Sequence, residues 1–215
     1  MKQTVLSLLL LLAGALGTPA ATIFDVSIDT SSLSGSGNLN FQVGVLGSPD
    51  PVSILLSNLS FDGTLDPSSK DLCFGDSPCP IAGELGTDPT VSFGNDPGNP
   101  PVIIDYLQPV TWGSQLSFRL TFAGMAVENP TLPSNGITSF EVVLLDNNFQ
   151  QLLSTDPALG SILSFIVEDG RVIPSNFSPT GEADVSEIPE PAAAGFVLLG
   201  LALAFAKRAS ATRRI

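Results

Sequence analysis

The segment LSFRLTF, residues 116–122, decides the fold class, because large apolar and polar side chains alternate along it without interruption. Successive side chains of a β-strand point to opposite faces, so a period of two buries one face and leaves the other to solvent. Residues 39–45 and 140–144 repeat the pattern, with apolar residues at every second position. The chain is therefore predicted to contain strands that each bury a single face.

Further short apolar segments lie between turns that are rich in Gly, Pro, Asp and Asn, and no part of the body has a sustained helical period. These segments are 23–28, 52–61, 102–107, 149–153 and 163–167, with 81–85 and 90–93 inside a long loop region. About eight to ten short strands separated by turns predict an all-β domain, an antiparallel β-sandwich of the jelly-roll-like type, over residues 21–176. The acidic, turn-rich residues 177–187 are predicted to be a linker.

The first twenty residues have the features of a secretory signal peptide. Lys2 gives a positive start, residues 5–16 are almost continuously apolar, and the small residues of Thr18-Pro19-Ala20-Ala21 predict cleavage after Ala20. An uncleaved N-terminal anchor is the alternative, but the apolar core is short and a cleavage site follows it directly. Residues 1–20 are therefore predicted to be removed on export.

The C-terminal end starts at Ile188 and Pro189-Glu190-Pro191, where the prolines keep the backbone extended. The uncharged apolar residues 192–206 come next, followed by a basic tail, Lys207, Arg208, Arg213 and Arg214. A helix over residues 192–206 spans about 22 Å, which is short for a hydrocarbon core of about 30 Å, but the flanking cations can snorkel. We therefore expect one transmembrane helix with a cytoplasmic basic end, in preference to a buried C-terminal helix.

The order of Pro-Glu-Pro, short apolar helix and basic tail over residues 188–215 resembles the PEP-CTERM sorting signal of bacteria. The resemblance implies that this signal holds the exported protein in the inner membrane until an exosortase cleaves near Pro189-Glu190-Pro191. The body would then pass to the cell surface or to an exopolysaccharide matrix. Residues 24–33 and 139–146 are similar to segments of small β-rich PEP-CTERM proteins, which implies a compact β-domain but no particular chemistry.

The body is strongly acidic. The whole chain has 8 Lys and Arg against 21 Asp and Glu, which gives a net charge of −13. Lys2, the four tail cations and Glu190 lie outside residues 21–187. The remaining 3 basic and 20 acidic residues give this body a net charge of −17. Such a charge keeps a protein soluble, repels nucleic acids and anionic surfaces, and attracts cations. Nucleic acid is therefore not expected as a partner.

The two cysteines, Cys73 and Cys79, flank five residues that include Gly and Pro. In an exported chain such a close pair most simply forms a local disulfide. A metal site is the alternative, but the sequence offers no histidine and no second cysteine pair to complete a zinc shell. A disulfide is therefore the prediction.

The absence of histidine from the sequence excludes Ser-His-Asp and Cys-His catalysis. A glycosidase needs only two carboxylates, but most acidic residues in this chain lie beside Gly, Pro or Ser, where turn formation and solubility explain them. Glu141 lies within a strand on the face opposite Phe140 and Val142, and it is expected to be exposed. We therefore expect no enzymatic activity, and a two-carboxylate polysaccharide hydrolase is the least favoured alternative.

No cofactor is expected, although calcium is the cation that loop carboxylates suit best. The candidate ligands are Asp62, Asp66, Asp71 and Asp76, together with Asp88 and Asp96 in a later loop, and their spacing matches no EF-hand.

Tyr106 and Trp112 are the candidates for an aromatic platform that binds sugar, although a single Trp beside a strand is more often part of the core. The sequence therefore favours a non-enzymatic cell-surface or extracellular-matrix protein, whose partners are an exosortase and, transiently, the inner membrane. A carbohydrate-binding module for exopolysaccharide is the first alternative.

Overall fold

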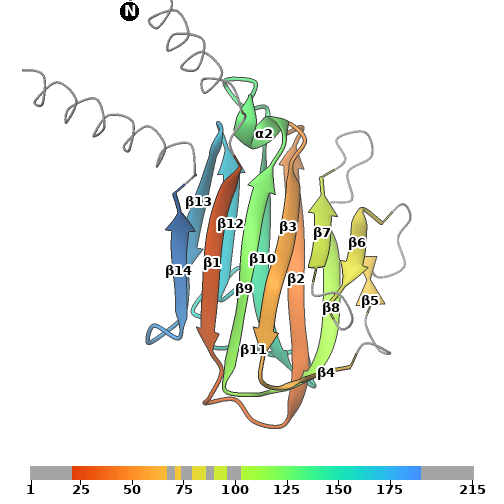
Figure 1. Cartoon of the computed structure of the whole chain (residues 1–215), viewed down its shortest axis with the longest axis vertical. Coiled ribbons are helices and arrows are strands. Elements are labelled where there is room, and N and C mark those ends of the chain that lie inside the picture. Colours follow the sequence, from red (N-terminus) through yellow and green to blue (C-terminus); the bar gives the residue numbers. More distant parts are fainter. Residues whose placement is uncertain (1–20, 67–70, 74–78, 86–89, 96–102, 190–215) are drawn as a thin grey trace, which may run out of the picture. The chain divides into compact units, whose positions relative to one another are not determined.

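Two antiparallel β-sheets, one in front of the other, account for nearly all of the regular structure among the described residues (Figure 1). The computed structural model describes residues 21–66, 71–73, 79–85, 90–95 and 103–189. Of these, the residues between 21 and 188 belong to one compact unit. The prediction of an all-β fold with two antiparallel sheets is therefore confirmed.

The two sheets contain six and eight strands. In order across the sheet, the six-stranded sheet consists of β14 (Ala183–Ile188), β1 (Thr22–Asp29), β9 (Gln115–Ala123), β3 (Ser53–Phe61), β7 (Thr90–Gly94) and β6 (Ile81–Glu84). The eight-stranded sheet consists of β13 (Arg171–Asn176), β12 (Leu163–Glu168), β10 (Gly136–Asp146), β2 (Ser36–Gly47), β8 (Ile103–Thr111) and β4 (Thr64–Leu65), with β11 (Gln151–Leu152) paired to β10 and β5 (Asp71–Leu72) paired to β8.

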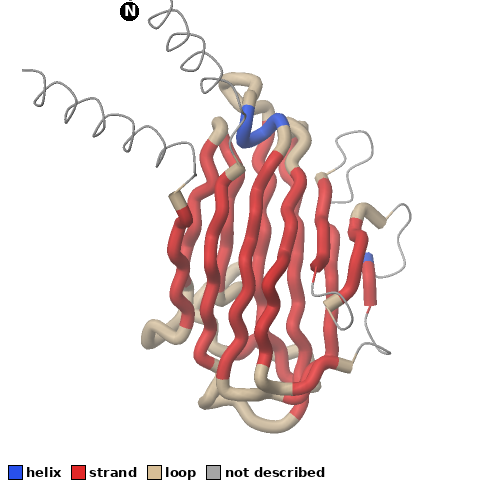
Figure 2. The backbone as a smooth tube through the Cα atoms, viewed as in Figure 1, coloured by secondary structure: helices blue, strands red, loops and turns tan. Residues whose placement is uncertain are grey.

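The segment LSFRLTF forms most of β9, which lies between β1 and β3. Its four apolar side chains, Leu116, Phe118, Leu120 and Phe122, are all buried, whereas the polar residues between them are partly exposed. Figure 2 shows how strands dominate the described part of the chain, with the short helix α2 (Met125–Glu128) at the end of β9. The period of two along the sequence is therefore the period of burial in the sheet.

Phenylalanine rings fill the space between the sheets. Phe24 of β1 packs on Phe165 of β12 with ring centroids 5.2 Å apart, and Phe41 of β2 meets Phe118 of β9 at 5.5 Å in an edge-to-face arrangement. Each of these pairs joins a strand of one sheet to a strand of the other. Because edge-to-face and offset ring pairs are favourable beyond the area that they bury, this aromatic layer holds the two sheets face to face.

Consecutive strands often change sheet. The chain passes from β1 to β2 to β3, and again from β8 to β9 to β10, by crossing from one sheet to the other and back. The longest pairing, between β10 and β2, runs from Gly136 opposite Gly47 to Asp146 opposite Gly37. Strands that are far apart in sequence therefore form the centre of each sheet, and neither sheet can form from a local segment alone.

The region from residue 62 to residue 101 contains the two short strands that were expected there, as β6 and β7, which pair with each other. It also contributes β4 and β5 to the edge of the other sheet. Cys73 and Cys79 are joined by a disulfide with an S–S distance of 2.17 Å and a Cα–Cα distance of 5.8 Å. The hairpin expected after Asp146 is present, because β11 pairs with the end of β10.

The prediction of a linker over residues 177–187 is wrong for its second half. Residues 183–188 form β14, which pairs with β1 along its whole length, from Ile28 opposite Ala183 to Ile23 opposite Ile188. Ala183 is buried and Val185 is partly buried, whereas Asp184 and Glu187 are exposed. Acidic side chains are typical of edge strands, because they discourage pairing with another chain, and in β14 they concealed a short apolar alternation.

The predicted signal peptide, residues 1–20, and the predicted transmembrane helix, residues 192–206, lie outside the described residues, as does the basic tail. Pro189 is described and exposed, whereas Glu190 and Pro191 are outside. Within the ranges that the structure does describe, no helix has the length and apolarity needed to span a bilayer.

Candidate functional site

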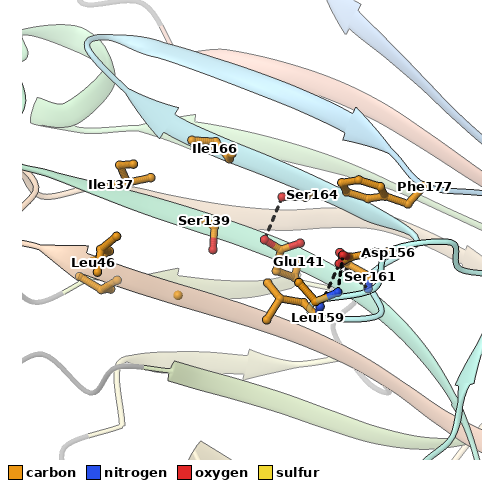
Figure 3. A pocket seen from close by; sticks show the side chains of 13 residues that line it. Leu46, Ile137, Ser139, Glu141, Asp156, Leu159, Ser161, Ser164, Ile166 and Phe177 are labelled. Atoms are coloured by element: carbon orange, nitrogen blue, oxygen red, sulfur yellow. Dashed lines mark hydrogen bonds between the residues drawn. The ribbon is translucent and has the colours of Figure 1, made fainter.

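A pocket of about 430 Å³ lies on the eight-stranded sheet (Figure 3). It is on the face that points away from the aromatic layer, because its lining residues Ser139 and Glu141 alternate with the core residues Phe140 and Val142. Its floor comes from β2, β10 and β12, and one wall comes from residues 153–162, which connect β11 to β12. This connection is fixed to its surroundings by backbone hydrogen bonds, from Thr155 N to Phe177 O (2.8 Å) and from Ile162 N to Val142 O (2.8 Å). The pocket is therefore formed by strands and by a loop that is tied to them.

Glu141 of β10 lies in the floor of the pocket. Phe140 and Val142 on either side of it point into the core, so its side chain points to the opposite face. It is nevertheless only 3% exposed. The prediction that Glu141 is exposed is therefore wrong. Alternation predicts correctly which face of the sheet Glu141 lies on, but it does not show that the 153–162 connection covers this part of the face.

The two oxygens of the Glu141 carboxyl group differ in their surroundings. The Ser164 hydroxyl on the neighbouring strand β12 donates a hydrogen bond to Oε1 at 2.8 Å. Oε2 is buried and has no hydrogen-bond partner among the described residues. The hydroxyls of Ser161 and Ser139 lie near enough to favour the charged carboxylate, but neither makes a well-formed hydrogen bond to Oε2.

Burial raises the pKa of Glu141 above its ordinary value, because a charged carboxylate loses the solvation of water. The hydroxyls of Ser164, Ser161 and Ser139 oppose this shift, and the nearby negative charge of Asp156 adds to it. The net effect is an acid that holds its proton to higher pH than a glutamate in solution.

Asp156 shapes the wall of the pocket. Its Oδ1 accepts a hydrogen bond from the Ala158 N–H (2.9 Å), and its Oδ2 accepts one from the Leu159 N–H (3.2 Å) and one from the Ser161 hydroxyl (2.9 Å). Burial acts to raise the pKa of Asp156, but these hydrogen bonds together lower it below its ordinary value. Asp156 is therefore held as a carboxylate whose oxygens are occupied in fixing the loop.

The remaining surface of the pocket is mostly apolar. It comes from Val45, Leu46, Ile137, Leu159, Ile166 and Phe177. Neither Lys nor Arg is among the described residues that line it. The pocket therefore combines one buried carboxyl group and several hydroxyls with apolar walls, and its described lining offers Glu141 no cation.

The two aromatic candidates for sugar binding do not reach a surface. Tyr106 is fully buried, and its hydroxyl accepts a hydrogen bond from the Leu85 N–H (3.1 Å) and lies 3.4 Å from Gln108 Oε1. Trp112 is 8% exposed and packs edge-to-face on Phe61. Both residues are part of the core, so neither offers a platform on which a sugar ring could stack.

The loop carboxylates proposed for calcium are not gathered into a site in the described part of the chain. Asp62 accepts hydrogen bonds from the N–H groups of Ser114 and Gln115, both at 2.9 Å, and from the Ser114 hydroxyl. It therefore ties two turns together. Asp76, Asp88 and Asp96 lie outside the described residues, and no group of three or more metal-ligating side chains is found among those that are described.

Sequence reasoning identified neither the pocket nor the role of Asp156. The one signal in the sequence was a glutamate inside a mostly apolar strand, two residues after Ser139. Only the structure shows that Ser164 lies opposite Glu141 in the neighbouring strand. Comparison with known proteins adds no further guide, because no family model, curated protein or solved structure matches this chain.

Proposed function

We propose that this chain is an exported, non-enzymatic protein of the cell surface or extracellular matrix, sorted by exosortase processing near Pro189-Glu190-Pro191. In this proposal residues 1–20 direct export, and a transmembrane helix over residues 192–206 holds the protein in the inner membrane with its basic tail in the cytoplasm. The sandwich is the part released to the outside. Its jelly-roll-like type is part of the proposal, and the strands that cross from one sheet to the other support it.

One observation carries this proposal. Among the described residues, the first strand begins at Thr22, two residues after the predicted cleavage at Ala20, and the last strand ends at Ile188, immediately before Pro189. Ile23 and Ile188 are partners in the same pair of strands, so the two ends of the folded unit lie side by side. Processing at both predicted sites would therefore leave every strand of the sandwich intact.

Two further features support an exported protein. The disulfide between Cys73 and Cys79 belongs to the class of bond that persists in oxidising compartments and is rare in the cytosol. The net charge of −17 over residues 21–187 suits a soluble surface protein and disfavours binding to nucleic acid.

The alternatives have less support. The aromatic platform for exopolysaccharide required Tyr106 or Trp112 at a surface, and both are buried. A two-carboxylate hydrolase needs one protonated acid and one free base. Glu141 fits the first role, but the oxygens of Asp156 are occupied by hydrogen bonds from its own loop.

The test is the localisation of tagged protein in its own host. Wild-type protein is expected mainly outside the inner membrane, and a double variant, Pro189→Ala with Glu190→Ala, is expected to remain in the inner-membrane fraction. Glu187→Ala, an exposed acidic residue that precedes the motif, is the matched control and should behave as wild type. Equal distribution of the wild-type protein and the double variant would contradict the sorting proposal.

A further inference from the structure

The Glu141 pocket holds an acceptor that its described surroundings do not satisfy. Oε2 of Glu141 is buried and lacks a hydrogen-bond partner among the described residues, and Figure 3 shows the carboxyl group in the floor of the pocket among Ser139, Ser161 and Ser164. A buried carboxylate without a counter-ion is costly, whereas one that is paired and hydrogen-bonded is tolerated. A positively charged donor is therefore the group that would complement this pocket.

The groups around Oε2 define which donor would fit. The hydroxyl oxygens of Ser139 and Ser161 line the same pocket as the carboxyl group, and hydroxyl oxygens accept hydrogen bonds. A primary ammonium group has three N–H donors, which matches one carboxylate oxygen and two hydroxyl oxygens. An anion is disfavoured, because Glu141 and Asp156 both face the pocket and the described lining includes neither Lys nor Arg.

The walls define the rest of the ligand. Ile137, Ile166 and Phe177 present apolar surface in the same pocket as the carboxyl group, and Leu46 and Leu159 are exposed at 72% and 49%. A volume of about 430 Å³ lies within the range of small-molecule sites. The surrounding acidic body also raises the local concentration of cations.

We propose that the pocket around Glu141 binds a primary ammonium group on an apolar stem, with the ammonium on Oε2 of Glu141 and the stem along the apolar walls. Two sources carry this chemistry, a free alkylamine and the side chain of a lysine in a polypeptide. This proposal stands on the geometry of the pocket and does not depend on how the protein is sorted.

The test is a titration of the full-length chain in mild detergent, followed by NMR at the amides of Ser139 and Ser161. n-Butylamine is expected to bind with a dissociation constant of about 1 mM, whereas 1-butanol and methyl glucoside, which carry no charge, should bind at least about tenfold more weakly. Nα-acetyl-lysine methylamide distinguishes the sources: tighter binding than butylamine indicates a polypeptide lysine, and weaker binding indicates a free amine.

Glu141→Gln is expected to weaken butylamine binding by about tenfold or more, because the amide carries no charge. Glu168→Gln is the matched control, since Glu168 is an exposed residue at the end of β12 that does not line the pocket, and it should bind as wild type. Equal binding of butylamine to wild type and to Glu141→Gln would overturn the proposal. So would equal binding of butylamine and butanol, or no binding of butylamine at all.

A second variant keeps the test informative if Glu141→Gln does not fold. Butylamine binding requires the Glu141 carboxylate, so affinity should rise as pH increases through the raised pKa of this group. Asp156 is the other titratable group on the described lining. Its pKa is lowered, so it is already ionised at the pH where Glu141 loses its proton. Ser164→Ala removes the hydrogen bond that lowers the pKa of Glu141, so the midpoint of the affinity profile should move to higher pH. An unchanged midpoint would contradict the assignment to Glu141.

Discussion

Replacing Phe140 with alanine should strongly destabilise the sandwich. Phe140 is fully buried, and its ring centroid lies 5.3 Å from Phe93, 6.0 Å from Phe41, 6.3 Å from Phe122 and 6.4 Å from Phe165. Phe93 and Phe122 belong to the six-stranded sheet, whereas Phe41 and Phe165 belong to the same sheet as Phe140. The ring therefore contacts both layers of the core.

The magnitude follows from this environment. Truncation of a buried Phe to Ala typically costs about 3–5 kcal/mol, and each aromatic pair contributes about 0.5–1.5 kcal/mol beyond buried area. With four ring neighbours, Phe140→Ala belongs at the upper end of that range, at about 4–5 kcal/mol. This is a large part of the roughly 5–15 kcal/mol by which folded domains are stable.

The assay is urea unfolding of the full-length chain in mild detergent, followed by the fluorescence of Trp112, the only tryptophan in the sequence. Phe149→Ala is the matched control, because Phe149 is 59% exposed, and it should change the free energy of unfolding by less than about 0.5 kcal/mol. A loss below about 1.5 kcal/mol for Phe140→Ala, or equal losses for both variants, would refute the packing of the two sheets on this ring.

Three further predictions concern ionisation and cross-linking. The pKa of Glu141 is raised in the folded state, so its contribution to stability is greatest at low pH and is lost as pH rises through that pKa. In urea unfolding, Glu141→Gln should therefore gain stability relative to wild type as pH rises from below the ordinary pKa of a glutamate to above the raised one. A difference that stays constant with pH would contradict the burial of the Glu141 charge. Reduction of Cys73–Cys79, or Cys73→Ser with Cys79→Ser, should cost about 2 kcal/mol, the value expected for closing so short a loop, and an unchanged urea midpoint would show that the cross-link does not stabilise the fold. Arg119→Ala removes a partly exposed ion pair with Asp25 and should cost less than about 1 kcal/mol of unfolding free energy. The hydrogen bond from Arg119 lowers the pKa of Asp25, so this pKa should rise in an NMR titration of the variant. An unmoved pKa would argue against the ion pair.

The fold class was predictable because the strands carry their signal locally. The alternation in LSFRLTF, and the same pattern around Phe41 and Phe140, place the core face without reference to any other segment. β14 was missed because its signal is weak, with only Ala183 and Val185 turned inward between acidic and polar residues. Its pairing with β1 depends on a strand that begins about 160 residues earlier in the chain, which no local pattern reports.

The candidate site was not predictable for a related reason. Alternation places Glu141 on the outer face of its strand, and an outer face is normally solvated. Its burial depends on the connection 153–162, which Asp156 folds over the sheet through hydrogen bonds within the loop. Loops of this kind take their shape from side chain to backbone contacts, so hydrophobic patterning carries little information about where they lie.

The sorting proposal is tested most sharply by the intact mass of the protein recovered from outside the inner membrane of its own host. We expect a mature form that lacks residues 1–20 and everything after the Pro189-Glu190-Pro191 motif, with Cys73 and Cys79 oxidised. A chain that retains residues 192–215, and is found only in the inner membrane, would contradict the proposal and leave a membrane-anchored sandwich with no role in the matrix.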